Sequence, residues 1–555
     1  MTQPHAAPPQ GDYYQLDERM SQPYGQNGGY QGGQPQYGQP QWGGQQPQQQ
    51  YGGGYQQGGG YQQGYPPPQQ QPPPDQYQQP AYGAPPPPPQ GEKYSFNEAF
   101  KIEKPKWNDI WAAILFMLFF LGFAAVSGIA IYGYTQANPR GGISGNNSFA
   151  LGSSTIVLFA IVLAVAVVFS WAYVWLARMF PKAFIWVTGI LNIVFALATA
   201  IYMLYNKYWS GGIVFLIFGL FLAFCFYTWI PRIPFSALML TTAIDVSKNY
   251  GHVYMVSWLG GLTGAAFAAW YAVTLVAVYN RWEPSDANPN CRNSSCSSGT
   301  VTGLIVFITF TMYWISEVLK NIIHVTISGV YGSWYFCVNN FPGGATRGAL
   351  KRAMTYSFGS ICFGSLIVAI INFLRHMCSV ARSQAAADGD MISYILFCIL
   401  GCLISLLDWA VTLFNRYAFS HIALYGKAYI PAAKDTWSMI KDRGIDALVN
   451  DCLIGPVLSF GATFIGYACA LLAFVYLYIT DPAYNQGGAY TPVIIAFSFL
   501  IGLQIANVFT TPISSGIDTI FVAAAWDPEV MIQQHPQLYA DMVRVYPQVQ
   551  QAIHA

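Results

Sequence analysis

The chain has 555 residues, a formal net charge of +1 and only 9% charged residues, whereas a soluble domain has about 25%. This composition excludes an ordinary soluble globular protein, and the near-neutral charge favours no nucleic-acid partner. Apolar residues are concentrated between about 107 and 513.

Residues 1–92 consist largely of Gln, Gly, Pro and Tyr, with no lysine before Lys93. Such a segment cannot bury enough apolar surface to offset chain entropy, so we predict a disordered tail. It lacks the basic start and apolar core of a cleaved signal peptide. Its spaced tyrosines allow two interpretations: a docking or self-association segment with unknown partners, or a solvated tail with at most trafficking or phosphorylation sites. Composition favours the second.

Ten apolar stretches follow, and each is long enough to cross a lipid bilayer, because a helix needs about 20 apolar residues for a core about 30 Å thick. They lie near 110–132, 154–177, 183–205, 212–230, 252–279, 301–322, 354–374, 391–413, 452–479 and 491–513. Backbone groups must be satisfied without water there, which requires helices. We predict an all-α polytopic membrane protein with about ten transmembrane helices, its membrane domain at 93–530 and a C-terminal tail at 531–555.

The distribution of Lys and Arg predicts the orientation, because these residues collect in cytoplasmic loops. If the N-terminus is inside, most of them fall in inner segments, for example Arg347, Lys351 and Arg352 after the sixth stretch. Both termini are therefore predicted to be cytoplasmic. Arg375 and Arg382 fall in a predicted outer loop against this rule, so the topology of 325–390 stays open.

The predicted outer loops carry two further signals. Asn146 and Asn293 begin the chain's N-x-S/T sequons, and both are predicted glycosylation sites in outer loops. Cys291 and Cys296 lie close together in the second of these loops, where an oxidising environment favours a small disulfide.

Motifs for enzymatic chemistry are absent from the sequence. There is no P-loop (residues 426–428 are the nearest approach), no H-E-x-x-H, no zinc-spaced cysteine set and no G-x-S-x-G. We therefore expect neither an ATPase nor another enzyme, and no metal or other cofactor.

Glu317 is the first ionisable candidate at membrane depth, where such side chains are costly and often functional. Tyr313 and Trp314 precede it by four and three residues, so all three share a helix face. A carboxylate beside aromatic rings suits a quaternary ammonium ion. The alternative is an ion pair with Lys320 near the cytoplasmic end of the helix.

Asp408 is the second candidate, and it has no basic residue within four positions. Its carboxylate could compensate the charge of a permeating cation or carry a proton. Alternatively, it could make a hydrogen bond to Thr412 or to another helix. The sequence leaves both interpretations open.

Small residues indicate helix contacts. Gly359, Ser360 and Gly364 in one stretch, and Gly260 and Gly264 in another, favour close helix packing. The segments 233–250 and 431–447 are predicted to be amphipathic helices at the inner leaflet.

Several motifs resemble the choline transporter-like family. Residues 355–366 (TYSFGSICFGSL) resemble its signature helix, residues 333–336 (SWYF) its aromatic stretch, and residues 415–419 (NRYAF) with 422–427 (IALYGK) its downstream segment. The tail composition resembles the fungal branch, the pH-nine-sensitive proteins. The resemblance implies ten spans, cytoplasmic termini and plasma-membrane transport of choline or a related amine, independent of ATP and sodium and either facilitative or proton-coupled.

The resemblance also suggests which residues meet the substrate. Aromatic faces would come from Tyr313, Trp314, Tyr335 and Tyr417, Asn415 would add a polar contact, and Glu317 or Asp408 would compensate charge or carry a proton. Two alternative functions remain: a membrane scaffold or stress sensor acting through its tail, and a lipid-handling protein.

Overall fold

The computed structural model describes residues 106–137, 153–282, 297–338, 341–442, 454–482, 485 and 491–547. The predicted tail at 1–92, the sequons at Asn146 and Asn293, and the pair Cys291 and Cys296 lie outside these residues. They remain predictions from the sequence.

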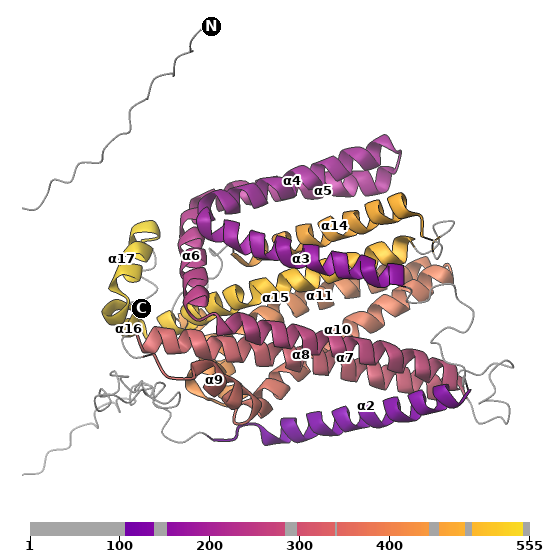
Figure 1. Cartoon of the computed structure of the whole chain (residues 1–555), viewed down its shortest axis with the longest axis horizontal. Coiled ribbons are helices and arrows are strands. Elements are labelled where there is room, and N and C mark those ends of the chain that lie inside the picture. The colour runs from indigo at the N-terminus through magenta and orange to yellow at the C-terminus, as the bar shows by residue number, and fades with distance from the viewer. Residues whose placement is uncertain are drawn as a thin grey trace, which may run out of the picture. The chain divides into compact units, whose positions relative to one another are not determined.

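The described ranges contain helices and no strand, as predicted for an all-α protein. Ten helical stretches within them are long and apolar enough to cross a membrane, which agrees with the ten predicted spans. The long helices run side by side (Figure 1). They are α2 (Ile110–Ala137), α3 (Ser153–Met179), α4 (Pro181–Tyr205), α5 (Trp209–Trp229), α7 (His252–Trp282), α8 (Ser298–Phe336), α10 (Phe358–Ala387), α11 (Met391–Tyr425), α14 (Ile454–Thr480) and α15 (Thr491–Trp526).

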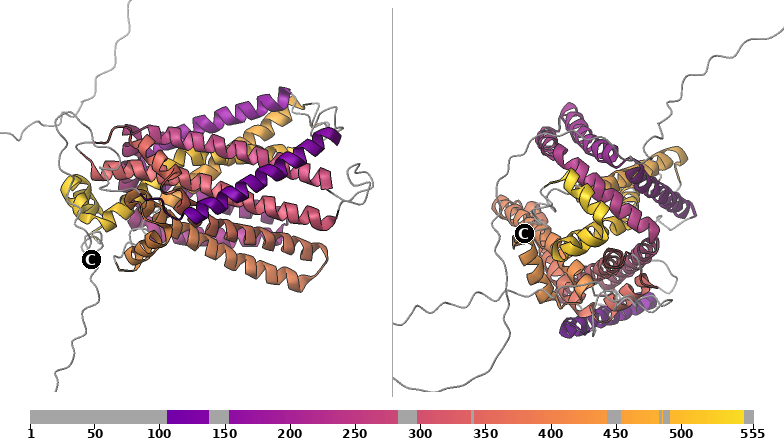
Figure 2. Two further views of the ribbon diagram at one scale, coloured as in Figure 1. Left: turned by 90° about the horizontal axis from the view of Figure 1, so that it is seen from below. Right: turned by 90° about the vertical axis from the view of Figure 1, so that its left-hand side faces the viewer.

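Shorter helices gather at one end of the bundle. Figure 1 shows α6, α9, α16 and α17 there, and Figure 2 shows α16 and α17 at this end from a second side. The charge pattern predicts that this end faces the cytoplasm, and we call it the inner end. The short elements are η1 (Ile230–Arg232), α6 (Ile233–Asn249), α9 (Ala345–Met354), α12 (Tyr429–Asp442), α16 (Pro528–Gln534) and α17 (Pro536–Val545).

Helix α6 is the segment predicted to lie on the inner leaflet. Pro231 and Pro234 separate it from α5, because proline lacks a backbone N–H and interrupts a helix. The helix is present, but most of its residues are buried, among them Phe235, Met239 and Leu240. The Phe235 ring stacks on Phe521 of α15, with centroids 6.2 Å apart. Much of α6 therefore packs against protein.

The folded part of the chain extends beyond residue 530. Residues 531–555 are the predicted C-terminal tail, and their described part completes α16 and forms α17. The side chains of Met531 and Met542 are fully buried. Apolar contacts therefore hold this segment against the inner end of the bundle.

Helix α10 makes unusually close contacts through its glycines. A Cβ atom at Gly359 would lie 2.3 Å from the carbonyl oxygen of Asn108, just before α2. A Cβ atom at Gly364 would lie 2.5 Å from the Tyr429 ring. The atoms that a Cβ would meet at Gly359 belong to the backbone, so only glycine permits that approach. The packing role of Gly359, Ser360 and Gly364 stays a prediction from the sequence. Helices α10 and α11 form a hairpin, which the left-hand view of Figure 2 shows from the side.

Candidate functional site

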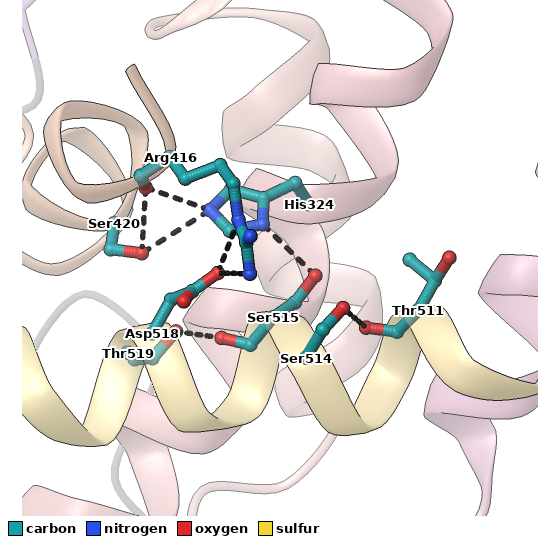
Figure 3. A network of polar contacts seen from close by, with 8 residues as sticks. All are labelled: His324, Arg416, Ser420, Thr511, Ser514, Ser515, Asp518 and Thr519. Carbon is teal, nitrogen blue, oxygen red and sulfur yellow. Dashed lines mark hydrogen bonds and ion pairs between the residues drawn. The ribbon is translucent and has the colours of Figure 1, made fainter. Parts of the chain in front are cut away.

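Helices α8, α11 and α15 meet around a buried histidine, His324 (Figure 3). Its Nδ1 atom lies 2.9 Å from the hydroxyl of Ser515, and its Nε2 atom lies 3.0 Å from the carbonyl oxygen of Arg416. Ser420 lies 3.2 Å from the same Nε2 atom. We call His324, Arg416, Ser420, Ser515 and Asp518 the central polar network.

The hydrogen bonds of His324 define its tautomer. A carbonyl oxygen can only accept, so Nε2 carries the hydrogen that is donated to Arg416. In the neutral ring Nδ1 then accepts from the hydroxyl of Ser515. If Nδ1 gained a proton, Ser515 could rotate and accept instead, because a hydroxyl does both. The site can therefore take up and release a proton at Nδ1 without losing its hydrogen-bond partners.

An ion pair completes the network. The Nε and Nη2 atoms of Arg416 donate to one oxygen of Asp518 at 2.8 and 2.6 Å. The side chain of Asp518 is only 6% exposed, and that of Arg416 is 35% exposed. A carboxylate this deeply buried requires a cation beside it. With His324 neutral, the charges of the network sum to zero.

A proline interrupts α15 just before the network. Pro512 has no N–H to donate, so the carbonyl of Val508 loses its usual partner within the helix. Ser257 of α7 donates to this carbonyl at 2.7 Å. Helix α15, which carries Ser515 and Asp518, therefore lacks one backbone hydrogen bond beside these residues. Bending the helix there requires less free energy than bending it elsewhere.

Further polar contacts link α8, α10, α11 and α12. Asn321 donates to Ser365 at 2.9 Å. Asn415, a predicted substrate-binding residue, donates to the carbonyl of Gly364 at 3.1 Å and accepts from the Tyr429 hydroxyl. Both ends of the Asn415 amide are thus used to join helices in this conformation.

Of the aromatic candidates on α8, Trp314 is fully buried. Its indole N–H donates to the carbonyl of Cys362 at 3.0 Å, and rings of Phe116 and Phe119 lie with centroids 5.4 Å from its own. Tyr313 is half-buried and faces His376, with ring centroids 6.1 Å apart. Trp314 is therefore occupied by packing, and Tyr313 is more accessible.

The two acidic candidates each form an ion pair. The Oε2 atom of Glu317 lies 3.5 Å from the Nζ atom of Lys320. This ion pair is one of the two alternatives that the sequence left open. Asp408 lies 2.8 Å from Arg375 of α10, and this partner could not be read from nearby positions. In both pairs the base is more exposed than the acid. Asp408 thereby balances the charge of Arg375, which the sequence places in a predicted outer loop, where Lys and Arg are disfavoured.

Tyr335 and Tyr417 are both buried. The Tyr335 hydroxyl donates to the carbonyl of Asp527 at 2.8 Å, and its ring stacks on His535 with centroids 5.5 Å apart. Tyr335 lies about 33 Å along α8 from Tyr313, at 1.5 Å per residue. The predicted residues are therefore spread along the bundle and do not form one compact site.

Sequence reasoning missed the central polar network. His324 and Arg416 fall just beyond the predicted spans 301–322 and 391–413, and the last predicted span ends at residue 513. In the structure α8 and α15 continue to Phe336 and Trp526. A usable signal was present, because Asp518 is the single charged residue in the apolar run 513–525. Within the described ranges, no group of three or more His, Cys, Asp or Glu side chains could hold a metal ion.

Comparisons with known proteins are consistent with this membrane architecture. A family model described as "Plasma-membrane choline transporter" matches residues 213–529, which include the whole central polar network. The chain is 67% identical over 465 residues to "Protein PNS1" of Gibberella zeae, covering 83% of this chain and 86% of that protein. It is 60% identical over 468 residues to "Protein pns1" of Aspergillus fumigatus, covering 83% and 87% respectively. "Protein PNS1" of Yarrowia lipolytica is 46% identical over 461 residues, covering 82% and 81%.

Proposed function

This chain belongs to the family of plasma-membrane choline transporters, and from that premise we propose that it carries choline or a related small organic amine across the plasma membrane. Transport would be facilitative or proton-coupled and would not use ATP. The substrate and the mode of coupling are the parts of this proposal that go beyond membership of the family.

The central polar network is the observation that supports this proposal. Ionisable side chains inside a membrane bundle are costly, and they commonly mark ion and substrate pathways. Here a titratable histidine and an Arg–Asp pair join three helices, and one of these helices is interrupted by Pro512. Such a centre can couple a change of charge to a change in helix contacts.

The candidates named from the sequence keep defined roles in the proposal. Glu317 and Asp408 would compensate the substrate's charge, since an incoming ammonium ion could replace Lys320 or Arg375 at the carboxylate. Tyr313 would offer an accessible ring. Trp314, Tyr335, Tyr417 and Asn415 would meet the substrate only in a second conformation, because they are buried in this one.

The proposal is tested by uptake of labelled choline into proteoliposomes that contain the purified protein. Saturable uptake that rises with a pH gradient supports a proton-coupled carrier, and saturable uptake without this response supports a facilitative one. No uptake of choline or ethanolamine above empty vesicles, from protein shown to be folded, contradicts the proposal. A chain lacking residues 1–92 should keep its flux, whereas a scaffold acting through the tail should lose its cellular phenotype.

Neutralising the two acidic candidates should weaken uptake. Glu317→Gln and Asp408→Asn each remove a carboxylate available to a cation. We expect uptake to fall about tenfold in each variant, which corresponds to a loss of about 1.4 kcal/mol of interaction free energy. Asp390→Asn is the matched control, because Asp390 is exposed at the start of α11, where its side chain accepts a hydrogen bond from the backbone N–H of Ser393. Unchanged uptake in both single variants and in the double variant, with normal surface expression, would remove these residues from the mechanism.

His324→Gln tests the proton-coupled form of the proposal. A glutamine amide can donate to the Arg416 carbonyl and accept from Ser515, so folding should be preserved. It cannot titrate, and the response of uptake to a pH gradient should disappear while uptake without a gradient continues. The measurement is the initial rate at several external pH values for the variant and the natural chain. An undiminished response in the variant would exclude His324 as the coupling group.

A further inference from the structure

At the inner end of the bundle, the ammonium group of Lys427 lies over two aromatic rings. Its Nζ atom is 5.0 Å from the ring centroid of Trp526 and 5.7 Å from that of Tyr425. The two ring centroids are 6.3 Å apart at an interplanar angle of 57°. The same ammonium group forms an ion pair with Asp435 of α12. We call Tyr425, Trp526 and Asp435 the aromatic cage.

The end of α11 creates this arrangement. The helix ends at Tyr425 and is capped by Gly426, whose φ of +63° lies in the left-handed region that favours glycine. Its N–H donates to the carbonyl of Ile422 at 3.0 Å, and its own carbonyl accepts from Asn108 at 2.7 Å. The chain therefore turns sharply, and the next residue, Lys427, is carried over Tyr425 and the end of α15.

The rings of the cage are held in place before any ligand arrives. The Tyr425 hydroxyl donates to a carboxylate oxygen of Asp527 at 2.5 Å. The His421 ring packs edge-on against Trp526 with centroids 5.0 Å apart. Rings fixed in this way lose little freedom when a cation binds to their faces.

The chemistry of the cage matches that of an organic ammonium ion. Ring faces attract a cation through their quadrupole, and a neighbouring carboxylate balances its charge. The contact of Arg281 with the ring of Trp282, at 5.0 Å, joins two consecutive residues of one helix and so forms no cage. In the cage the two rings and the carboxylate come from three helices, and the cation is on a long flexible side chain that is 35% exposed.

We propose that the aromatic cage is a binding site for a small organic cation, and that Lys427 fills it when no such cation is bound. Lys427 acts as a tethered competitor: when the ligand's ammonium group enters, the lysine side chain moves into solvent and the charge in the cage is unchanged. That the natural ligand is the transported amine rests on the proposed function, and the cage would then be the substrate's site at the inner end.

Binding of labelled tetramethylammonium to the purified full-length protein tests the site without requiring transport. Lys427→Ala removes the competitor, so we expect binding about fivefold tighter, the effect of a cation–π contact worth about 1 kcal/mol. Adding Trp526→Leu to this variant should abolish the gain. Lys434→Ala and Trp437→Leu are matched controls, since both residues are exposed on α12, and neither should change the affinity.

The result that overturns the site is equal or weaker binding in Lys427→Ala, or a gain that survives Trp526→Leu. If Lys427→Ala is not monodisperse, Lys427→Ser replaces it, because serine is equally small and suits a polar turn. Failure of this site and failure of the proposed function are distinguishable. Choline uptake by the natural chain without the expected change in tetramethylammonium affinity rejects only the cage, whereas tighter binding without uptake rejects only transport.

Discussion

Replacing Asp518 with asparagine is expected to destabilise the protein by about 3 kcal/mol, as in other proteins in which one partner of a buried ion pair is removed. Arg416 would keep its charge without the carboxylate to which two of its nitrogens donate. The proposed uptake of choline should be lost as well, because the network joins α8, α11 and α15. The measurements are thermal unfolding in detergent and uptake in proteoliposomes.

A matched control separates burial from charge. Asp541→Asn breaks the ion pair with Arg544 on α17, where the arginine side chain is 76% exposed. Exposed pairs contribute less than about 1 kcal/mol, so this variant should behave like the natural chain. The double variant Arg416→Leu with Asp518→Leu should regain much of the stability, because it leaves no uncompensated charge, yet it should not regain uptake. Equal unfolding temperatures for Asp518→Asn and Asp541→Asn would contradict the prediction.

Gly359→Ala is expected to reduce both stability and the yield of folded protein. The added Cβ would lie 2.3 Å from the carbonyl oxygen of Asn108 and 2.4 Å from that of Asp109. These are backbone atoms, so no side-chain rotation relieves the overlap. Overpacking of this kind costs about 1–3 kcal/mol or more.

The backbone beside Gly359 has little freedom to move. Asp109 has a φ of +50°, and its carboxylate accepts from the hydroxyl of Ser360 at 2.6 Å and from the backbone N–H of Tyr429 at 2.8 Å. A shift of this segment would break both contacts. The control is Gly264→Ala, because a Cβ atom at Gly264 meets nothing within 4 Å and alanine favours a helix. Similar unfolding temperatures and similar yields of monodisperse protein for the two variants would contradict the close contact between Gly359 and the backbone at Asn108 and Asp109.

The architecture was accessible from the sequence because hydropathy acts locally. Each predicted span could be recognised from about 20 consecutive residues, and ten suitable helical stretches are present in the described part of the chain. An amphipathic helix within 233–250 is also predicted from the sequence, and the structure has α6 there. The deep burial of α6 was not predicted, because burial depends on α15 and on other segments distant in sequence.

The ion pairs show where local reasoning stops. Glu317 and Lys320 are three positions apart on one helix, so their pair was among the predicted alternatives. Asp408 and Arg375 are 33 positions apart, and Arg416 and Asp518 are 102 apart. No periodicity within one helix contains information about a partner on another helix.

The aromatic residues followed the same division. The sequence placed Trp314 in a predicted span and Tyr335 beyond its end, in the aromatic stretch that resembles the family's, and the family motifs indicated an organic cation as the substrate. Only the tertiary structure decided that packing covers these two rings and that Tyr425 and Trp526 are the rings facing a cation. The sequence by itself thus determined the number and apolar character of the membrane-length helical stretches, because bilayer crossing depends on consecutive apolar residues. The tertiary structure decided which charges and ring faces meet, because this depends on the rotation of each helix against its neighbours.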